Sequence, residues 1–456
     1  MARVPLAQAV KEISGTFSGQ LLQPADPGYE EARRVHNGLI DKRPALIARC
    51  LGVADVVDAV RIGRSQGLEV AVRGGGHNAA GRATTDAGLM IDLSLMKGIS
   101  VNSKSRTARA QGGVTWAELN RETQLHGLAT TGGFVSTTGI AGLTLGGGLG
   151  WLMGKHGLTI DNLLSVDMVL ADGRIVTASK NQNPDLFWAV RGGGGNFGVA
   201  TYFEYRLHRV GPTITGGLVA HPFGQAKSLL TFFREVAPRL PDELTVFAGL
   251  FHAPDGSGTK LAGIVACHCG ATRQGEAATR PLKKFGSPAI DIIGPMSYCE
   301  MNSMFDASYP KGALNYWKSC FITDLSDEAI DAMIDAFSRC PSPMSGLSME
   351  YFHGTAVRKP VGSTAFPLRT RGYDLLLLTQ WKDRSDNERC IAWARETYAR
   401  MKPFMARSKY VNYLDNDETV DQVAAAYGPN YPRLQRIKKK YDPTNLFHMN
   451  QNIRPA

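Results

Sequence analysis

The sequence lacks any stretch typical of a membrane span or a secretion signal. Among its 456 residues there is no run of about 18 uninterrupted apolar residues, the length that a transmembrane helix needs. Residues 1–8 include Arg3 and Pro5 and have no apolar core of the kind found in a signal peptide. We therefore expect a cytoplasmic protein that does not bind a membrane.

Cysteine is scarce and scattered. The chain has seven cysteines, an odd number without regular spacing, which argues against a disulfide framework. Only Cys267 and Cys269 stand close together, and a single CxC pattern lies outside the usual spacings of zinc ligands and alternates as a strand does. We predict reduced thiols and no bound metal.

Acidic residues are fewer than basic ones, and the net charge is +10. The densest basic run, residues 433–440, contains Leu434 and Ile437 at helical spacing, so we expect the solvated face of a helix. No stacking-aromatic or groove-reading motif accompanies this run. The composition therefore predicts no nucleic-acid partner, and the positive field suits an anionic cofactor or substrate.

Glycine, in contrast, is abundant. The chain has 50 glycines, and the densest clusters form blocks at 74–81, 132–150 and 192–198. Between these blocks, residues 53–66 have the apolar spacing of a helix, whereas residues 68–72 and 89–93 have the pattern of strands. Because the chain is too long for one ordinary core, we expect two intertwined domains with α+β structure and loops gathered around a ligand.

The third glycine block raises the possibility of a nicotinamide-binding Rossmann domain. Residues 193–198 form a GxGxxG pattern, which binds a pyrophosphate only where its last glycine opens a helix. Residues 199–207 are instead rich in β-branched and aromatic residues with period-two alternation, so they predict a strand. The looser match at 74–79 is also not followed by a clear helix, and we reject the Rossmann interpretation.

The first glycine block ends in a histidine. Three successive glycines, Gly74, Gly75 and Gly76, allow the backbone to approach a ligand and to point N–H groups at phosphate oxygens. His77 follows as the nucleophilic side chain at the exit of the loop. This residue is placed to contact a cofactor or to form a bond with it.

Five motifs in order along the chain resemble the vanillyl-alcohol-oxidase superfamily, and within it the berberine-bridge-enzyme-like branch. They lie at residues 73–78, 146–162, 171–173, 195–199 and 441–453. The resemblance runs nearly end to end and implies an α+β fold: a two-part FAD-binding domain of the PCMH type with an inserted α+β substrate domain built on an antiparallel sheet. We place the FAD-binding domain at residues 1–206 and 416–456, and the substrate-binding domain at residues 207–415.

The resemblance also implies a covalent bond between His77 and the 8α carbon of FAD, the alternative being a histidine that only packs near the flavin. Many relatives carry a second link through a cysteine, but the corresponding residue here is Val135. We therefore predict a single covalent attachment. Because a doubly attached flavin usually accompanies an open, carbohydrate-accommodating site in this family, we do not expect a bulky oligosaccharide as substrate.

The remaining flavin contacts follow from the same resemblance. Glycines and polar residues of the loops would hold the pyrophosphate, the ribityl chain and the ring, Asp161 and Asn162 would fix the second loop, and Val199 would lie at the adenine pocket. The full set is Arg73, Gly74, Gly75, Gly76, His77, Asn78, Gly81, Ser136, Thr137, Thr138, Gly139, Gly142, Gly147, Gly150, Asp161, Asn162, Val199, Asn450 and Asn452.

Oxygen reactivity in this family depends on the space beside flavin C4a. The gate position falls at Thr138, which is similar in size to the valine of oxidase members and smaller than the leucine of many dehydrogenase members. This favours molecular oxygen as a partner and hydrogen peroxide as a product.

The catalytic base is not named by any motif. Tyrosines that plant-type relatives keep are replaced here by Ala79 and Leu149. Residues 349–353 predict a strand that places Tyr351 and His353 on one face, and we expect this face to carry the base, with Glu350 and Phe352 pointing away. Further candidates are Asp374 and Gln380 on a second strand, where the alternative for the carboxylate is a strand-end cap. Asn412 and Tyr413 lie in a segment that returns to the flavin, and Tyr316 and Trp317 are candidate pocket walls, the alternative being core packing.

These observations together predict an FAD-dependent oxidase that transfers a hydride from a small alcohol or amine to flavin N5. Two alternatives stay open: a dehydrogenase that uses another electron acceptor, and a flavin-binding protein without catalysis. The sequence leaves the substrate and the oligomeric state undetermined.

Overall fold

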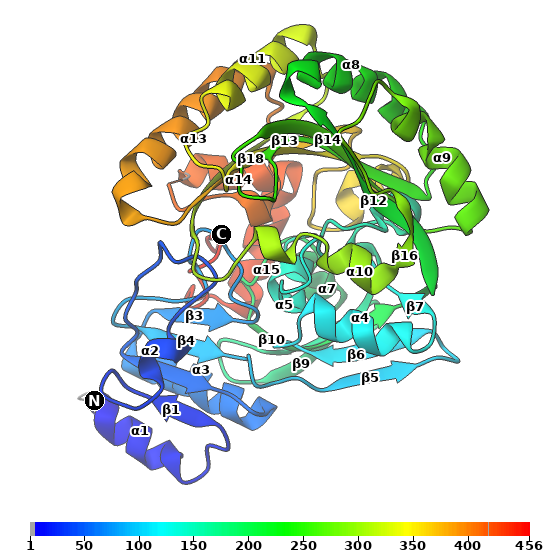
Figure 1. Ribbon diagram of the computed structural model, residues 1–456. Helices are drawn as coiled ribbons and strands as arrows, with labels where there is room; N and C mark the ends of the chain where they lie inside the picture. Colours follow the sequence, from blue (N-terminus) through cyan, green and yellow to red (C-terminus); the bar gives the residue numbers. More distant parts are fainter. Residues whose placement is uncertain (1–4, 418) are drawn as a thin grey trace.

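A small buried sheet begins the part of the chain that the computed structural model describes, residues 5–417 and 419–456 (Figure 1). Its elements are α1 (Leu6–Ser14), β1 (Gln20–Leu22), α2 (Tyr29–Ala32), β2 (Leu46–Arg49), α3 (Val53–Gln66), β3 (Val70–Arg73) and β4 (Leu89–Asp92). The strand order is β1-β2-β4-β3, and β4 pairs in parallel with both β2 and β3. Parallel strands are buried on both faces, which explains the short continuous apolar runs. The helix and the two strands predicted for this region are confirmed.

A second, antiparallel sheet in the order β5-β6-β10-β8-β9 follows. The elements of this region are β5 (Ile99–Asn102), β6 (Thr107–Gln111), α4 (Trp116–Gln124), β7 (Leu128–Ala129), α5 (Ile140–Leu145), α6 (Met153–His156), β8 (Leu163–Val169), β9 (Ile175–Ser179), α7 (Pro184–Val190), β10 (Val199–Arg206) and β11 (His208–Arg209). The third glycine block runs directly into β10, at the centre of this sheet. A strand therefore follows that block, and the geometry of a Rossmann phosphate loop is absent there.

The middle of the chain forms a large antiparallel sheet in the order β15-β12-β14-β13-β18-β19-β17, with β16 also paired to β12. Its region contains β12 (Thr213–Pro222), α8 (Ala226–Val236), β13 (Leu244–His252), β14 (Lys260–His268), α9 (Thr272–Lys284), β15 (Ile290–Asp291), β16 (Gly294–Ser297), α10 (Tyr298–Ser303), β17 (Leu314–Ile322), α11 (Asp327–Ser338), β18 (Gly346–Phe352), α12 (Thr355–Arg358), β19 (Gly372–Trp381) and α13 (Asn387–Met401). The helices α8, α9, α11 and α13 arch over its outer face, while its inner face turns toward the first part of the chain (Figure 1).

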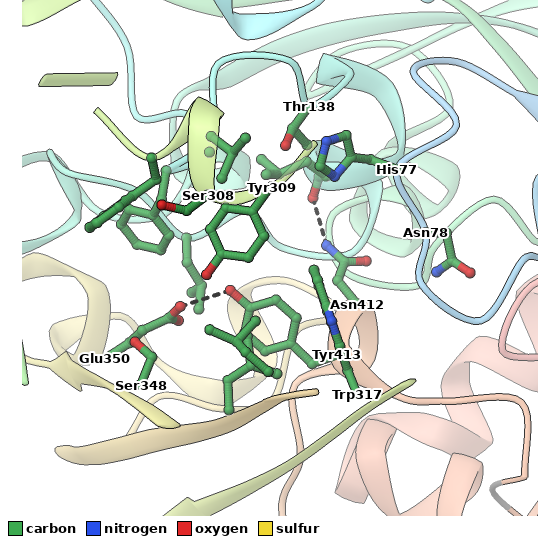
Figure 2. Close-up of a pocket in the computed structure, with 18 of the residues that line it drawn as sticks. His77, Asn78, Thr138, Ser308, Tyr309, Trp317, Ser348, Glu350, Asn412 and Tyr413 are labelled. Carbon is green, nitrogen blue, oxygen red and sulfur yellow. Dashed lines mark hydrogen bonds between the residues drawn. The ribbon is translucent and has the colours of Figure 1, made fainter. Parts of the chain in front are cut away.

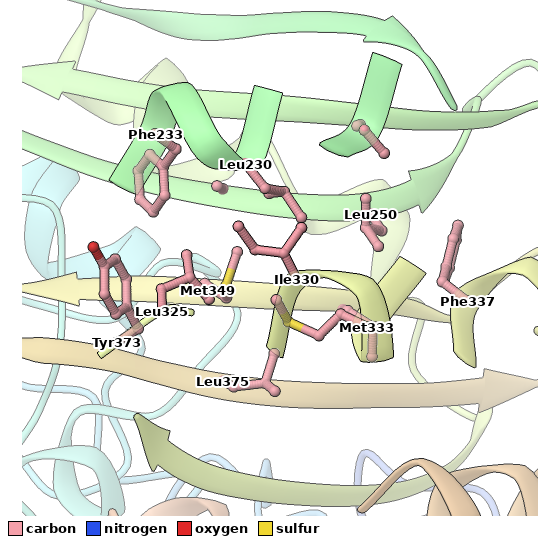
Figure 3. Packing of buried hydrophobic residues seen from close by; sticks show 14 of the residues in the cluster. Leu230, Phe233, Leu250, Leu325, Ile330, Met333, Phe337, Met349, Tyr373 and Leu375 are labelled. Atoms are coloured by element: carbon pink, nitrogen blue, oxygen red, sulfur yellow. The ribbon is translucent and has the colours of Figure 1, made fainter. Parts of the chain in front are cut away.

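The outer face of the large sheet is the apolar core of this region. Leu230 and Phe233 of α8 and Ile330 of α11 pack onto Met349 of β18 and Leu375 of β19 (Figure 3). Because side chains alternate between the two faces of a strand, the residues between these core positions must turn to the inner face. The side chains at positions 348, 350, 374 and 376 are thereby directed toward the first part of the molecule.

The C-terminal segment returns to the first part of the chain. It contains α14 (Val420–Tyr427) and α15 (Tyr431–Tyr441), and α15 packs against α7. Leu434 and Ile437 are buried as expected, but the basic face is not wholly solvated. Lys438 is fully buried, pairs with Asp442 at 2.6 Å and donates to the backbone oxygens of Asn196 and Phe447. The prediction of a solvated face is wrong at this lysine because it joins the chain end to the third glycine block.

The fold is the predicted α+β architecture, in which the inner face of an inserted antiparallel sheet turns toward two separated parts of the chain. We propose that the inserted domain comprises residues 207–415, since the large sheet and its outer helices lie within that range. None of the helices in the described parts of the chain is both long and apolar enough to cross a membrane.

Candidate active site

A cavity of about 770 Å³ separates the glycine-rich loops from the inner face of the large sheet. This volume lies within the roughly 300–1,000 Å³ typical of ligand pockets. Glycine-rich loops, including residues 74–78 and 138–142, line one side, and strands β13, β18 and β19 line the other. The turn at residues 410–413 and residues 450–451 complete the wall, so both parts of the first domain and the inserted sheet contribute to the cavity.

The first glycine loop presents backbone donors to this cavity. Within the described chain, no group accepts a hydrogen bond from the N–H groups of residues 75–78. Gly76 has a φ of +68°, a conformation that glycine adopts readily. Successive unpaired N–H groups form a concave anion site, and the pyrophosphate of FAD is an anion that could bind there. A Cβ at Gly142 would meet no atom within 4 Å, so the second loop also leaves space for a ligand.

His77 stands at the wall of the cavity (Figure 2). Its Nε2 lies 3.0 Å from the Thr137 hydroxyl, and its ring stacks on His36 with the ring centres 3.8 Å apart. Burial, with a smaller contribution from His36, lowers the pKa of His77 to about 3. The imidazole is therefore neutral at physiological pH, and one ring nitrogen keeps a lone pair. That is the state in which a histidine can form a bond to carbon.

Part of the predicted cofactor set faces the cavity. The residues that line it are Gly74, Gly75, Gly76, His77, Asn78, Thr138, Gly139, Gly142 and Asn450. These positions fit a flavin nucleotide, because they combine free backbone donors, a neutral histidine and side-chain-free surfaces that a flat ring system can approach.

Other residues of the predicted cofactor set do not line the main cavity, and their contact with FAD stays a prediction. Arg73 donates to Asp92 from Nε at 2.8 Å and to two backbone oxygens, so its guanidinium supports the loop from behind. Asp161 pairs with Arg369 at 2.8 Å. The further residues that do not line the main cavity are Gly81, Ser136, Thr137, Gly147, Gly150, Asn162, Val199 and Asn452.

The physical reasons why these residues lie away from the main cavity differ. The backbone N–H of Ser136 donates a hydrogen bond to Asp306 at 2.9 Å. Val199 is completely buried within a strand. A Cβ at Gly150 would lie 1.8 Å from the oxygen of Gly132, so glycine is required there by close packing between loops. Asn162 donates to backbone oxygens at 3.0 Å and thereby fixes the second loop, which is the part of its prediction that the structure supports.

The turn at residues 410–413, which includes the 3-10 helix η8 (Val411–Tyr413), connects the two sides of the cavity. The N–H of Gly148 donates to the Tyr410 hydroxyl at 3.0 Å, and Asn412 Nδ2 donates to the oxygen of Leu143 at 3.1 Å. These bonds hold the turn against the glycine loops. Asn412 and Tyr413 consequently face the cavity, as predicted from the sequence.

Glu350 and Tyr413 form the central polar pair of the cavity (Figure 2). The Tyr413 hydroxyl donates to Glu350 Oε1 at 2.8 Å, while Oε2 has no protein partner within the described residues. Glu350 is only 3% exposed. Burial, reinforced by the negative charge of Asp374, raises the pKa of Glu350 well above its usual range. A buried carboxyl group at a cavity wall, with one oxygen left unpaired, is suited to proton transfer.

The sequence-based choice of face on β18 is wrong. Tyr351 lies on the outer side, where its ring contacts Phe233 of α8 and Tyr373 of β19. His353 lies just beyond the strand, stacked on Tyr351, and does not line the cavity. Glu350, which was expected to point away, faces the cavity instead. The alternation was a usable signal, because one face of this strand carries Gly346, Ser348 and Glu350 and the other carries apolar residues.

Asp374 lies directly across from Glu350 on the neighbouring strand β19 but does not itself line the cavity. Both of its carboxyl oxygens are buried without a hydrogen-bond partner in the described chain. Burial raises the pKa of Asp374 to about 8. Its predicted role as a group that touches substrate is therefore corrected to that of a neighbour that acts on Glu350.

Two aromatic residues complete the surroundings of Glu350. Tyr309, from the loop after α10, points its hydroxyl toward Glu350, and Trp317 of β17 lies beside Tyr413 (Figure 2). Sequence reasoning missed Tyr309, since no motif surrounds it. Trp317 lines the cavity as predicted. Tyr316 instead lies on the helix-covered face of the sheet, and its hydroxyl donates to Asp417 at 2.6 Å.

Replacing Asp374 by asparagine is expected to flatten the dependence of stability on pH. The carboxyl ionises near 3.9 in an unfolded chain and near 8 in the folded protein. Between these values the folded state binds more protons, so wild-type stability falls as pH rises, by on the order of 1 kcal/mol per pH unit. Denaturant midpoints at pH 5 and pH 8 test this. The control is Glu235→Gln, at an exposed position on α8, and an equal slope in Asp374→Asn and wild type would contradict the prediction.

Two family models match this chain, one before and one after the segment that forms the large sheet. Residues 44–179 match a model described as FAD binding domain, and residues 409–454 match one described as berberine and berberine like. The first match contains the loop with His77, and the second contains Tyr413 and Asn450. Both matched segments contribute to the same cavity.

Individual relatives cover nearly the whole chain. (R)-6-hydroxynicotine oxidase of Paenarthrobacter nicotinovorans is 32% identical over 451 residues, which cover 96% of this chain and 97% of that protein. The solved structure of 6-hydroxy-D-nicotine oxidase from Arthrobacter nicotinovorans is similar with a TM-score of 0.88 at 28% identity, covering 100% of both chains. The overall layout and the segment at residues 43–50 resemble that enzyme as well.

A plant-type structure shares the fold. BBE-like 1 of Physcomitrella patens has a TM-score of 0.89 at 23% identity and covers 99% of this chain and 100% of its own. Cavity, motifs and end-to-end similarity agree, and the chain belongs to the berberine-bridge-enzyme-like branch of the FAD-linked oxidoreductases.

Proposed function

We propose that this enzyme is an oxidase that oxidises an alcohol or amine and carries its FAD on a single covalent bond to His77. The observation that carries the proposal is the Glu350–Tyr413 pair, which faces the same cavity as His77 and the glycine loops. A proton acceptor beside a flavin site is the arrangement that this class of oxidation requires.

FAD, when bound, would supply the electron sink for hydride transfer from the substrate carbon and for the reduction of oxygen to hydrogen peroxide. The chain supplies the remaining groups. The N–H groups of residues 75–78 would bind its pyrophosphate. Glu350, in its ionised form, removes the proton from the substrate hydroxyl or amine, and the Tyr413 hydroxyl orients it through the 2.8 Å hydrogen bond. Tyr413 is retained from the sequence prediction, and Glu350 replaces Tyr351 and His353.

The single covalent link rests on His77 and Val135. The neutral imidazole of His77 has a nitrogen lone pair available, whereas Val135, which also lines the cavity, has no nucleophilic atom. A covalent bond keeps the cofactor from dissociating and makes the flavin a stronger oxidant.

Oxygen as electron acceptor is supported by the size of Thr138, which lines the cavity. Thr138→Leu is expected to slow reoxidation of the reduced flavin by about tenfold, corresponding to roughly 1.4 kcal/mol in the barrier, because the longer side chain closes the space that oxygen needs. Stopped-flow mixing of reduced enzyme with oxygenated buffer measures this rate. Thr138→Val is the matched control and should keep the rate; a large rise in that variant, or no fall in Thr138→Leu, would contradict the assignment.

The function itself is tested by anaerobic bleaching of the flavin across a panel of alcohols, amines and sugars, followed by admission of oxygen. Bleaching by an alcohol or amine with stoichiometric hydrogen peroxide on reoxidation is the expected result. Bleaching without peroxide but with electron transfer to a quinone would make the protein a dehydrogenase. A flavin that no compound bleaches would indicate a flavin-binding protein without this activity.

A further inference from the structure

The cavity continues beyond Glu350 along the inner face of the large sheet. Its floor is formed by alternate residues of three adjacent strands, Phe247, Gly249 and Phe251 of β13, Glu350, Ser348 and Gly346 of β18, and Leu376, Leu378 and Gln380 of β19. Gly346 precedes Glu350 by four residues, a separation of about 13 Å at ~3.3 Å per residue in a strand. The space available to a ligand therefore extends well past the proposed reacting group.

This extension is apolar. Phenylalanine and leucine side chains provide most of its floor, and Ile292, Met304 and Phe305 border it from the loops. Among the described residues on this side of the cavity, Glu350 is the only Asp or Glu, and none is Lys or Arg. Burial lowers the pKa of His252 at the far end, so its ring is neutral at physiological pH. A charged ligand would find no counter-ion there, and a many-hydroxyl ligand would find few partners besides Ser345, Ser348 and Gln380.

Two glycines that face each other keep part of the floor flat. Gly249 of β13 pairs with Gly263 of β14. A Cβ at Gly249 would lie 2.7 Å from the oxygen of Leu347, and a Cβ at Gly263 would lie 2.9 Å from the Phe251 ring. The packing therefore leaves bare backbone between Phe247 and Phe251. A flat surface bordered by aromatic rings suits a planar or linear apolar body.

The far end of the extension is open. It lies between residues 252–254 with Gly256, at the turn after β13, and residues 343–345, before β18. Pro254, Gly256 and Pro343 are exposed. The cavity thus has a mouth through which a long ligand can enter along the strands, with its reacting end at Glu350.

We propose that the substrate carries its reacting hydroxyl or amine on an extended, uncharged, apolar body that occupies about 13 Å of the sheet floor. This inference rests on the proposed function and narrows its substrate class. It excludes oligosaccharides of the same length, because their hydroxyl groups would face phenylalanine and leucine side chains.

The purified, oxidised holoenzyme, kept anaerobic, is to be titrated with n-alkan-1-ols from butan-1-ol to decan-1-ol and with cellobiose, followed by flavin absorbance and unfolding temperature. We expect the dissociation constant to fall about three- to fourfold for each added methylene group, and cellobiose to bind more weakly than every alcohol above hexan-1-ol. Affinity that stops rising at butan-1-ol, or cellobiose that binds as tightly as decan-1-ol, would overturn the proposal.

A charge in the extension gives a second test. Leu378→Lys is expected to weaken decan-1-ol binding by about tenfold or more, with the loss shrinking as the chain shortens. Ile175→Lys, at a position 61% exposed on β9, is the matched control and should bind as wild type does. Equal losses for butan-1-ol and decan-1-ol in Leu378→Lys would contradict the placement. Binding can be measured without turnover, so this series tests the substrate class even if no compound bleaches the flavin. A flavin that no compound bleaches would contradict the proposed function and not the shape of the binding site.

Discussion

Glu350→Gln is expected to lower kcat by about 10²–10⁴-fold while the protein keeps its FAD. The loss follows from removing the group that accepts the substrate proton, a contribution of this size in general base catalysis. Glutamine keeps the side-chain length and can still accept the hydrogen bond from Tyr413, which is 2.8 Å long in the wild type. Rapid-reaction measurement of anaerobic flavin reduction isolates the chemical step from reoxidation.

The pH profile sharpens this expectation. The pKa of Glu350 is raised by burial and by Asp374, so wild-type flavin reduction should accelerate as pH rises and Glu350 loses its proton. In Glu350→Gln this increase of the reduction rate with pH should disappear. In Asp374→Asn it should move to lower pH, since a negative neighbour that opposes ionisation has been removed.

Tyr351→Phe is the matched control for Glu350→Gln. Tyr351 is the adjacent residue on the same strand, but its side chain packs with Phe233 and Tyr373 on the helix-covered face. Its removal should leave the rate of flavin reduction within about twofold of wild type, a difference below roughly 0.5 kcal/mol. A large loss in Tyr351→Phe together with normal reduction in Glu350→Gln would return the base to the face predicted from the sequence.

His77→Ala is expected to abolish covalent attachment of the flavin. Acid precipitation of the wild-type protein should leave all yellow colour in the pellet, and precipitation of the variant should release all of it. The reason is that alanine offers no nucleophilic atom, and Val135 cannot replace it. Mass spectrometry of the peptide containing residue 77 locates the bond independently.

His36→Phe is the control for this experiment. His36 stacks on His77 with the ring centres 3.8 Å apart, and phenylalanine preserves the stacked ring without a titratable nitrogen. This variant should keep its flavin in the precipitate. Wild-type protein that releases its flavin, or a His77→Ala protein that retains it, would show that the histidine only packs beside the cofactor.

The site could be predicted from the sequence where short-range pattern determines geometry. Glycines 74–76 and the histidine after them require only local backbone freedom, and this loop does line the cavity. The strand after the third glycine block, β10, was readable from its alternation and rightly argued against a Rossmann domain.

Other residues of the predicted cofactor set do not line the main cavity, because long-range partners within the protein hold them. Arg73 pairs with Asp92, and Asp161 pairs with Arg369, 208 residues further along the chain. A basic helix suggested solvent exposure, yet Lys438 is fully buried against Asp442. No local pattern distinguishes an arginine that binds phosphate from one that supports the loop beneath it.

The sequence by itself determined the family, the α+β architecture, the flavin loop and the alternation of side chains along β18. Only the tertiary structure decided which face of β18 is covered by α8 and α11 and which face borders the cavity, and therefore whether Glu350 or Tyr351 meets the substrate. It also decided that Asp374 stands across from Glu350. The physical reason is that alternation divides a strand into two faces, whereas the identity of each face depends on elements far away in the chain that pack against it.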